Sequence, residues 1–292
     1  MSDEPRITNP FLPGAEKPPS EGPPLKLEWT AISVSGSRKP INDDSWLAIA
    51  SDFEGAKRLE ASGSFALRDH DLTFAVSDGM GGGQAGNVAS KLLLEEFSRL
   101  IPQTFTTAAA GFYPDYITHL DEAIQVVHHA INQQAEQDPA KKGMAATVAL
   151  GWFTPENLYF ASAGDSRIYR YREGETEQIT CDHNFAWRKM QRGEITERQY
   201  RANPRRSALY QIMGGGHERV VPDIEATSYQ EGDRFLICSD GLVDGLWDKH
   251  IAKHLSQNLS STSATADALI QRALANDGTD DTTIIVINVL KN

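Results

Sequence analysis

The pattern of apolar and polar positions changes at Leu27. From there on, short apolar runs punctuated by Gly and Asp are typical of strands that end in tight turns. They predict β-strands over 28–34, 45–50, 72–77, 146–153, 158–163, 167–172, 219–226, 234–239 and 282–289. Apolar residues spaced three and four apart predict one helix after Gly86 and a second one through Ile117, Leu120, Ile124, Val127 and Ile131. Shorter helices are predicted from the capping box of Thr196 and Gln199, and over 248–257 and 264–275.

The order of these elements predicts the fold class. Strands and helices come in blocks rather than in strict alternation, which favours an α+β protein over a doubly wound parallel sheet. Many short strands joined by tight turns indicate two packed antiparallel β-sheets flanked by helices, an αββα four-layer sandwich. We expect residues 27–292 to form this single domain, and we assign no role to residues 51–71 within it.

The first 26 residues differ in composition from the rest. Residues 1–26 hold seven of the fourteen prolines and few large apolar side chains. Such a segment buries too little surface to offset the entropy that is lost on ordering. We therefore predict a disordered, proline-rich N-terminal tail, for which the alternative function is a docking peptide.

Composition and charge exclude several classes of protein. The 292 residues include 40 Asp and Glu against 28 Lys and Arg, a formal charge of −12, which argues against a nucleic-acid partner. Cys181 and Cys238 are too few for a disulfide framework, and no Cys/His cluster has zinc spacing. No apolar stretch reaches about 18 residues, so we expect no membrane span. The first residues lack the features of a signal peptide, so we expect a cytoplasmic protein.

Aspartates stand where five of the predicted strands begin or end: Asp43 with Asp44, Asp78, Asp165, Asp240, and Asp280 with Asp281. Each motif alone is typical of a turn, because Asp and Gly are among the commonest turn residues. Together, without His or Cys, they predict a carboxylate-only site for two or more hard cations at one edge of the sandwich. A phosphate-binding loop is disfavoured, because neither the P-loop lysine nor GxGxxG spacing follows the strand 72–77.

Four motifs occur in a fixed order along the chain: Asp78-Gly79-Met80-Gly81-Gly82, Gly164-Asp165-Ser166-Arg167, Ser239-Asp240-Gly241-Leu242 and Asp280-Asp281-Thr282-Thr283. This ordered set resembles the metal-dependent type-2C serine/threonine protein phosphatases (PPM family), specifically their bacterial branch, over about residues 28–290. The resemblance implies two to three Mn²⁺ or Mg²⁺ ions. It also implies hydrolysis of phosphoserine and phosphothreonine in proteins by a metal-bridging hydroxide, and a cognate Ser/Thr protein kinase as partner.

The resemblance also implies roles for individual residues. The metal ligands would be Asp44, Asp78, the carbonyl of Gly79, Asp165, Asp240 and Asp280. Among the catalytic acids Asp44, Asp78 and Asp240, the bridge between two ions would be Asp78, and Asp165 would join Asp240 at a third, weaker site. Arg38 would hold the substrate phosphate, and residues 182–215 would form a mobile flap beside the active site.

Two positions leave alternatives open. Arg38 lies six residues before Asp44, one more than in the family, and Asp43 is an alternative for the ligand position. Asp281 stands where the family usually has Asn, so Asp280 and Asp281 can exchange roles. The alternative function is a catalytically silent relative of the same fold that binds phosphoproteins and regulates them.

Overall fold

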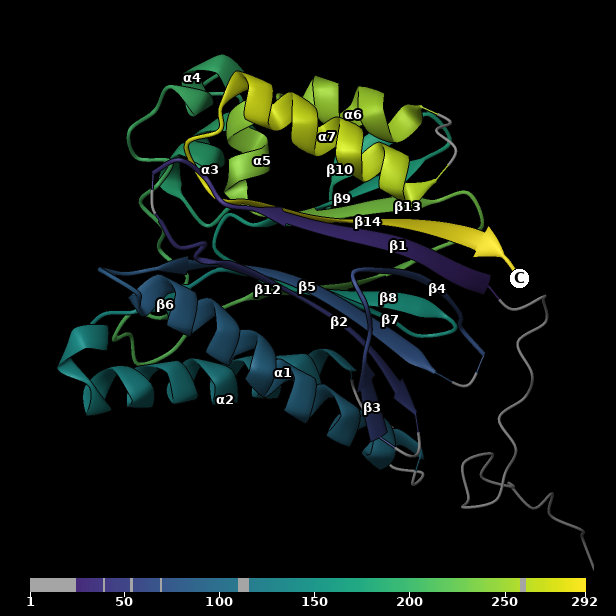
Figure 1. Cartoon of the computed structure of the whole chain (residues 1–292), viewed down its shortest axis with the longest axis horizontal. Coiled ribbons are helices and arrows are strands. Elements are labelled where there is room, and N and C mark those ends of the chain that lie inside the picture. Colours follow the sequence, from purple (N-terminus) through teal and green to yellow (C-terminus); the bar gives the residue numbers. More distant parts are fainter. Residues whose placement is uncertain (1–24, 39, 53–54, 69, 110–115, 258–260) are drawn as a thin grey trace, which may run out of the picture.

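In the computed structural model, the described part of the chain folds into four layers (Figure 1). It comprises residues 25–38, 40–52, 55–68, 70–109, 116–257 and 261–292. Two β-sheets pack face to face in the middle, and helices cover the outer face of each sheet. The prediction of an α+β fold with two antiparallel sheets flanked by helices is confirmed.

The first sheet contains six strands in the order β10-β9-β13-β14-β1-β4, and all neighbours are antiparallel. Its strands are β1 (Leu25–Val34), β4 (Ser62–Ala66), β9 (Arg167–Arg172), β10 (Glu175–Gln178), β13 (Arg234–Cys238) and β14 (Thr282–Lys291). β1 pairs with β14 over ten residues, from Leu25 opposite Lys291 to Val34 opposite Thr282. The first and last strands of the described chain are therefore neighbours within the same sheet.

The second sheet contains eight strands and is organised around β5. Its strands are β2 (Asp44–Asp52), β3 (Gly55–Arg58), β5 (Asp71–Met80), β6 (Ala145–Ala146), β7 (Val148–Phe153), β8 (Asn157–Ala163), β11 (Met213–Gly214) and β12 (Asp223–Ser228). β5 pairs with β2 on one side and with β6 and β7 on the other. The strand that carries the first aspartate-glycine motif is thus held on both edges.

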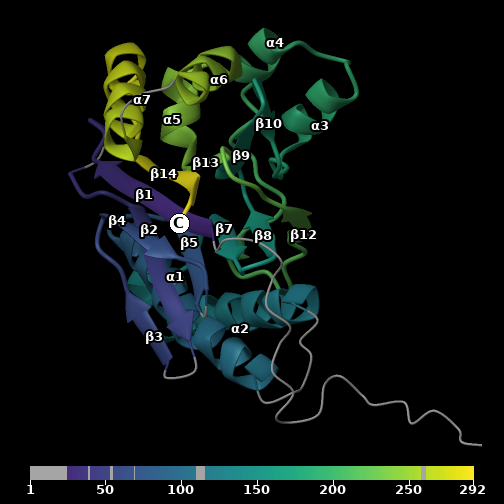
Figure 2. The ribbon, with the colours of Figure 1, turned by 90° about the vertical axis from the view of Figure 1, so that its right-hand side faces the viewer.

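Helices cover the two outer faces. α1 (Ala85–Ala109) and α2 (Tyr116–Gln137) lie on the second sheet, and α5 (Asp240–Gly245), α6 (Asp248–Ser256) and α7 (Thr262–Asn276) lie on the first (Figure 2). α3 (Phe185–Gln191) and α4 (Glu197–Arg201) belong to the predicted flap and lie to one side of the sandwich. A short 3₁₀ helix, η1 (Pro139–Lys141), follows α2.

Alternation along the strands builds three apolar layers. In β5, Phe74 and Val76 face the other sheet, whereas Ala75 faces the helix layer of α1 and α2. Between the sheets, the rings of Phe74, Phe153 and Phe235 meet edge to face at centroid distances of 5.9 and 5.2 Å. Each fully buried phenylalanine contributes about 1.5–3 kcal/mol relative to an exposed one. Because side chains alternate between the two faces of a strand, Val76 and Asp78, two and four residues after Phe74, face the same inter-sheet space.

The structure corrects several sequence-based boundaries. The predicted tail, 1–26, is too long by two residues, because Leu25 and Lys26 already pair with β14, while residues 1–24 lie outside the described part. The strand predicted over 219–226 is shifted to β12 at 223–228. Residues 51–71 contain β3 and β4, which pair with β2 and β1 respectively, so this segment passes from the second sheet to the first. Among the short elements, β3, β4, β10, β11 (Met213–Gly214), α3 and α5 were not predicted. Among the described residues, no helix has the length and apolarity that crossing a membrane requires.

Candidate metal centre

Asp44 and Asp78 lie directly opposite each other, because β2 and β5 are antiparallel and pair these two residues. Directly opposed side chains on one face of a sheet have Cβ atoms about 4.5–5.5 Å apart. Asp78 is four residues after Phe74, so both carboxylates face the space between the sheets. The strand register therefore brings two of the predicted ligands together.

Asp43 faces the opposite side of the sheet. A Cβ atom added to Gly86, at the start of α1, would lie 2.9 Å from Asp43 Cγ, so the Asp43 carboxyl group is packed against that helix. Ser45, two residues on, hydrogen-bonds to Ser90 of the same helix at 2.9 Å. The geometry thus favours Asp44 over Asp43 as the residue that points to the inter-sheet site.

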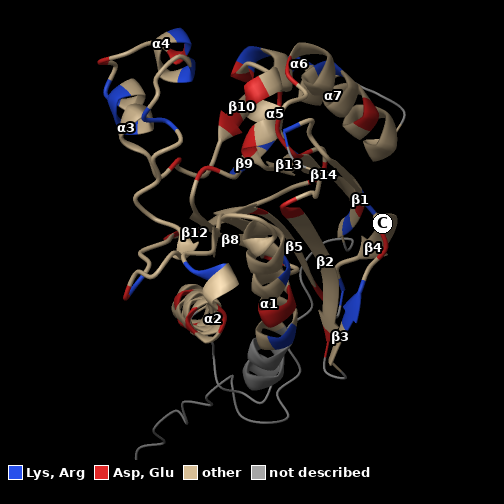
Figure 3. Ribbon diagram, turned by 60° about the vertical axis from the view of Figure 1, so that its left-hand side comes forward, with Lys and Arg blue, Asp and Glu red and all other residues tan. Residues whose placement is uncertain are grey.

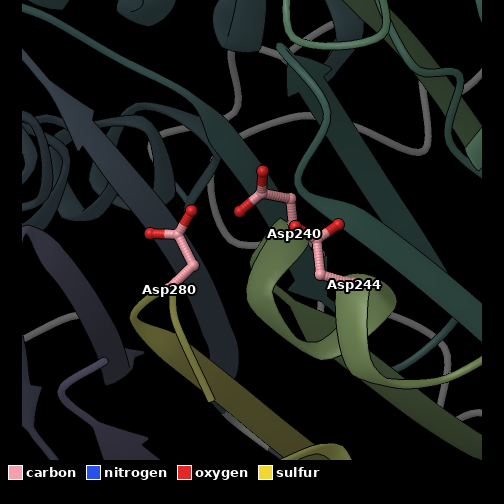
Figure 4. Close-up of side chains that lie close together, drawn as sticks. All are labelled: Asp240, Asp244 and Asp280. Atoms are coloured by element: carbon pink, nitrogen blue, oxygen red, sulfur yellow. The ribbon is translucent and has the colours of Figure 1, made fainter. Parts of the chain in front are cut away.

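Asp165 lies between β8 of the second sheet and β9 of the first, and the first sheet positions further acids. Asp240 is the first residue of α5 and is separated from the end of β13 by Ser239, and Asp280 lies two residues before β14. One carboxylate oxygen from each of Asp240, Asp244 and Asp280 lies within 4.8 Å of the others (Figure 4). Sequence analysis missed Asp244. Its signal is the spacing of four residues from Asp240, which puts both side chains on one helical face, but α5 itself was not predicted.

Hydroxyl groups connect the motifs. Ser239 Oγ donates a hydrogen bond of 2.6 Å to Asp44 Oδ2, which ties the end of β13 to the start of β2 across the two sheets. The backbone N–H of Asp78 donates to Thr147 Oγ1 at 2.9 Å, and that hydroxyl hydrogen-bonds to Ser166 Oγ at 2.6 Å. Asp78 and the loop of Asp165 are thus held in one hydrogen-bonded chain.

The electrostatics of the site are those of crowded, buried carboxyl groups. Burial raises the pKa of Asp44 to about 7, and the hydrogen bond from Ser239 opposes that rise. Burial and the charge of Asp182 raise the pKa of Asp165 to about 7. The pKa values of Asp78 and Asp240 lie well above the usual range, first because of burial and then because of neighbouring aspartates.

This arrangement fits hard divalent cations. Several carboxylates that are withdrawn from water and close together repel one another unless positive charge offsets them. Asp44 Oδ1 is buried and has no hydrogen-bond partner among the described residues. All the candidate donors are oxygen atoms, which are the ligands that Mg²⁺ and Mn²⁺ prefer.

Asp280 and Asp281 have different surroundings. The Asp281 carboxylate accepts hydrogen bonds from the backbone N–H groups of Gly36 at 2.8 Å and Asp43 at 2.7 Å. Asp280 Oδ2 instead forms an ion pair of 2.7 Å with Arg38 and lies in the cluster with Asp240 and Asp244. The contacts therefore support a structural role for Asp281 and a place at the metal centre for Asp280.

Alanine substitutions at Asp280 and Asp281 distinguish metal binding from a structural role. Asp281→Ala leaves two backbone N–H groups without their charged acceptor, so we expect a loss of about 2–3 kcal/mol in the free energy of unfolding in chelator. Asp280→Ala is expected to change that free energy by under about 1 kcal/mol and to weaken Mn²⁺ binding. Urea denaturation and Mn²⁺ titration of both variants measure this. A stability loss confined to Asp280→Ala would reverse the assignment.

Arg38 and the flap border the cluster. The Arg38 side chain is 59% exposed, and its guanidinium contacts Asp280. On the other side, a cavity is lined by Asp165 and Asp240 together with Tyr200, Arg206 and Ser207 of the flap region. Arg206 forms an ion pair with Asp244. Of the predicted site residues, Arg38 is therefore at the rim, and the flap residues close one side of the acidic cluster.

Comparisons with known proteins identify the family and agree with the fold. The sequence profile of the family described as Protein phosphatase 2C matches residues 59–276. The serine/threonine protein phosphatase PstP of Mycobacterium tuberculosis is 35% identical over 91% of this chain and 46% of its own length, so the chain spans about half of that relative. The crystal structure of the M. tuberculosis phosphatase PstP/Ppp matches with a TM-score of 0.74 and 30% identity, covering 91% of this chain and 100% of that one. The PstP catalytic domain in complex with two manganese ions matches with a TM-score of 0.71 and 29% identity, covering 91% and 99%. The chain belongs to the protein phosphatase 2C family.

Proposed function

We propose that the protein hydrolyses phosphoserine and phosphothreonine in proteins with the aid of Mn²⁺ or Mg²⁺. The observation that carries this proposal is the convergence of buried aspartates from both sheets on one inter-sheet site. The names of the relatives support it, because PstP is called a serine/threonine protein phosphatase and its catalytic domain binds two manganese ions.

We assign the acids to two central metal ions and to a third ion beside them. Asp78 would bridge two ions, with Asp44, the Gly79 carbonyl, Asp240 and Asp280 completing their ligands. Asp165 and Asp240 would hold a third ion, to which we add Asp244 because its carboxylate oxygen lies within 4.8 Å of that of Asp240. When bound, such ions lower the pKa of coordinated water and offset charge on phosphoryl oxygens.

The other residues orient the substrate and the ligands. We assign phosphate binding to Arg38, because a guanidinium can hold a phosphate through two parallel hydrogen bonds and this side chain lies beside Asp280 at the rim. Ser239 holds Asp44 in place through its hydroxyl group. A cognate Ser/Thr protein kinase and a cytoplasmic location follow only from the sequence-based reasoning and stay predictions.

The metal requirement tests the proposed function. We expect no release of phosphate from a phosphothreonine peptide in excess chelator, and recovery with Mn²⁺ that exceeds recovery with Zn²⁺, because all the donors are oxygen. Phosphate release and the metal content of the protein are the measurements. Full activity of metal-free protein would rule out this mechanism. Binding of the phosphopeptide without any phosphate release, whatever the metal, would support the alternative of a catalytically silent regulator.

A further inference from the structure

The flap region differs in charge from the rest of the molecule. Residues 182–215 contain seven Lys and Arg against three acidic residues, a net charge of +4, so the remainder of this −12 chain carries −16. Figure 3 shows basic residues on α3 and α4, whereas acidic residues gather around α5 and the neighbouring strand ends. This basic segment of an acidic protein therefore lies next to the acidic cluster.

The cations of this segment are directed to solvent. Five of them are exposed, and we call these five the basic flap surface: Arg188, Lys189, Arg192, Arg198 and Arg205. Within the described part of the chain, Arg192 pairs with Glu194 at 3.2 Å and the Arg188 guanidinium stacks over Tyr210 at 4.2 Å. No ion pair joins Lys189, Arg198 or Arg205 to any described carboxylate. Most of this positive charge is thus available to an external anion.

One end of the basic flap surface lies next to the candidate metal centre. Arg205 is adjacent in sequence to Arg206, which forms the ion pair with Asp244 and lines the cavity that contains Asp165 and Asp240. A substrate whose phosphorylated residue reached the aspartate cluster would therefore place its flanking residues over the flap.

The α4 part of the surface is held firmly. Tyr200 is buried and its hydroxyl group donates a hydrogen bond of 2.6 Å to Asp182 Oδ2. Arg201 donates to the backbone carbonyls of Asp244 at 2.7 Å and Leu246 at 3.0 Å. Glu197 Oε1 accepts from the Asp248 N–H at 3.2 Å. Because these contacts hold α4 against the end of α5, the backbone position of Arg198 is fixed relative to the metal centre.

We propose that the basic flap surface binds anionic side chains that flank the phosphorylated residue, so that the enzyme prefers acidic or multiply phosphorylated segments of its substrate proteins. This inference rests on the proposed function and adds the substrate class to it. Arginine and lysine clusters recognise carboxylate and phosphate groups, and a potential of opposite sign speeds the encounter of the partners. Since the surface is exposed, salt weakens the attraction.

The test compares phosphothreonine peptides with one core and three flanks: neutral, rich in Asp and Glu, or carrying a second phosphoserine. At low ionic strength, we expect kcat/KM of the wild-type protein to be about tenfold higher with an anionic flank, mainly through KM. The double variant Arg198→Glu, Arg205→Glu is expected to lose this preference. The double variant Lys57→Glu, Arg58→Glu, which makes the same charge change on exposed β3, should retain it. A preference for either anionic flank supports the proposal, and comparing the two flanks identifies the anion.

Three results would count against the proposal, and each has a different meaning. If the wild-type protein hydrolyses all three peptides with equal kcat/KM, the docking surface is refuted while the proposed function stands. If Mn²⁺-loaded protein hydrolyses neither the peptides nor p-nitrophenyl phosphate, the proposed function fails and this inference fails with it. A preference that persists unchanged in the double variant, with wild-type thermal stability, would also overturn the assignment to these residues.

Discussion

Asp78→Asn is expected to lower the turnover of a phosphothreonine peptide by at least about a hundredfold. Asp78 faces Asp44 across the strand pair, and its pKa is raised by burial and then by the charges of Asp240, Asp44 and Asp165. It therefore lies among carboxylates from both sheets, as a residue that bridges two ions would. Asparagine keeps the side-chain size and removes the charge on which cation binding depends. Steady-state phosphate release at saturating Mn²⁺ is the measurement.

The stability of the same variant separates loss of metal from loss of fold. Removing one of several mutually repelling buried charges should raise the melting temperature in chelator and reduce the further rise that Mn²⁺ produces. Asp71→Asn is the matched control, because Asp71 starts the same strand, about 23 Å away along it, and accepts a hydrogen bond from Trp152 Nε1 at 3.0 Å. Near-normal turnover in Asp78→Asn, with the control also unchanged, would remove Asp78 from the metal centre.

Gly86→Ala is expected to destabilise the protein by about 3 kcal/mol, at the upper end for overpacking. A Cβ atom at this position would lie 2.5 Å from the carbonyl oxygen of Gly79 and 2.9 Å from Asp43 Cγ. The atom in the way belongs to the backbone of β5, so no side-chain rotation relieves the overlap. α1 must then move away from the strand end that carries Asp78. Urea denaturation measures the loss, and Mn²⁺ titration measures the accompanying fall in affinity.

Gly82→Ala is the control for that experiment. Gly82 lies in the glycine-rich turn just before α1, but a Cβ atom there would meet nothing within 4 Å, and its backbone does not have a positive φ. We expect a change within about 0.5 kcal/mol. Equal destabilisation by the two substitutions would mean that the turn needs flexible glycines in general rather than a close approach of α1 and β5.

The architecture and the approximate location of the site are predictable from local patterns in the sequence. Apolar runs that end in Asp and Gly specify strands and their turns locally, so most strands and the long helices were predictable from periodicity. The recurrence of aspartate beside glycine or serine at strand ends is why the sequence alone predicts that Asp78, Asp165 and Asp240 share one site. In an antiparallel sheet every second strand ends at the same edge, and β5 and β8 meet that condition because both pair antiparallel with β7. Their ordered motifs also identified the family.

The difference between adjacent acids depends on contacts with distant parts of the chain. Asp43 and Asp44 are equivalent in composition, but the register with β5 turns one toward α1 and the other toward Asp78. Asp281 differs from Asp280 because two backbone N–H groups from distant segments donate hydrogen bonds to its carboxylate. These choices depend on partners up to 245 residues away in sequence, which no local pattern encodes.

The short helices and strands were not predicted for the same reason, because they depend on tertiary partners. α5 has only six residues, too few to show helical periodicity, so Asp244 was overlooked although it lies one turn beyond Asp240. β3, β4 and β10 are strands of four or five residues that are largely exposed, so they lack an apolar run. Pairing with a neighbouring strand stabilises them, and that neighbour is defined only once the two sheets have assembled.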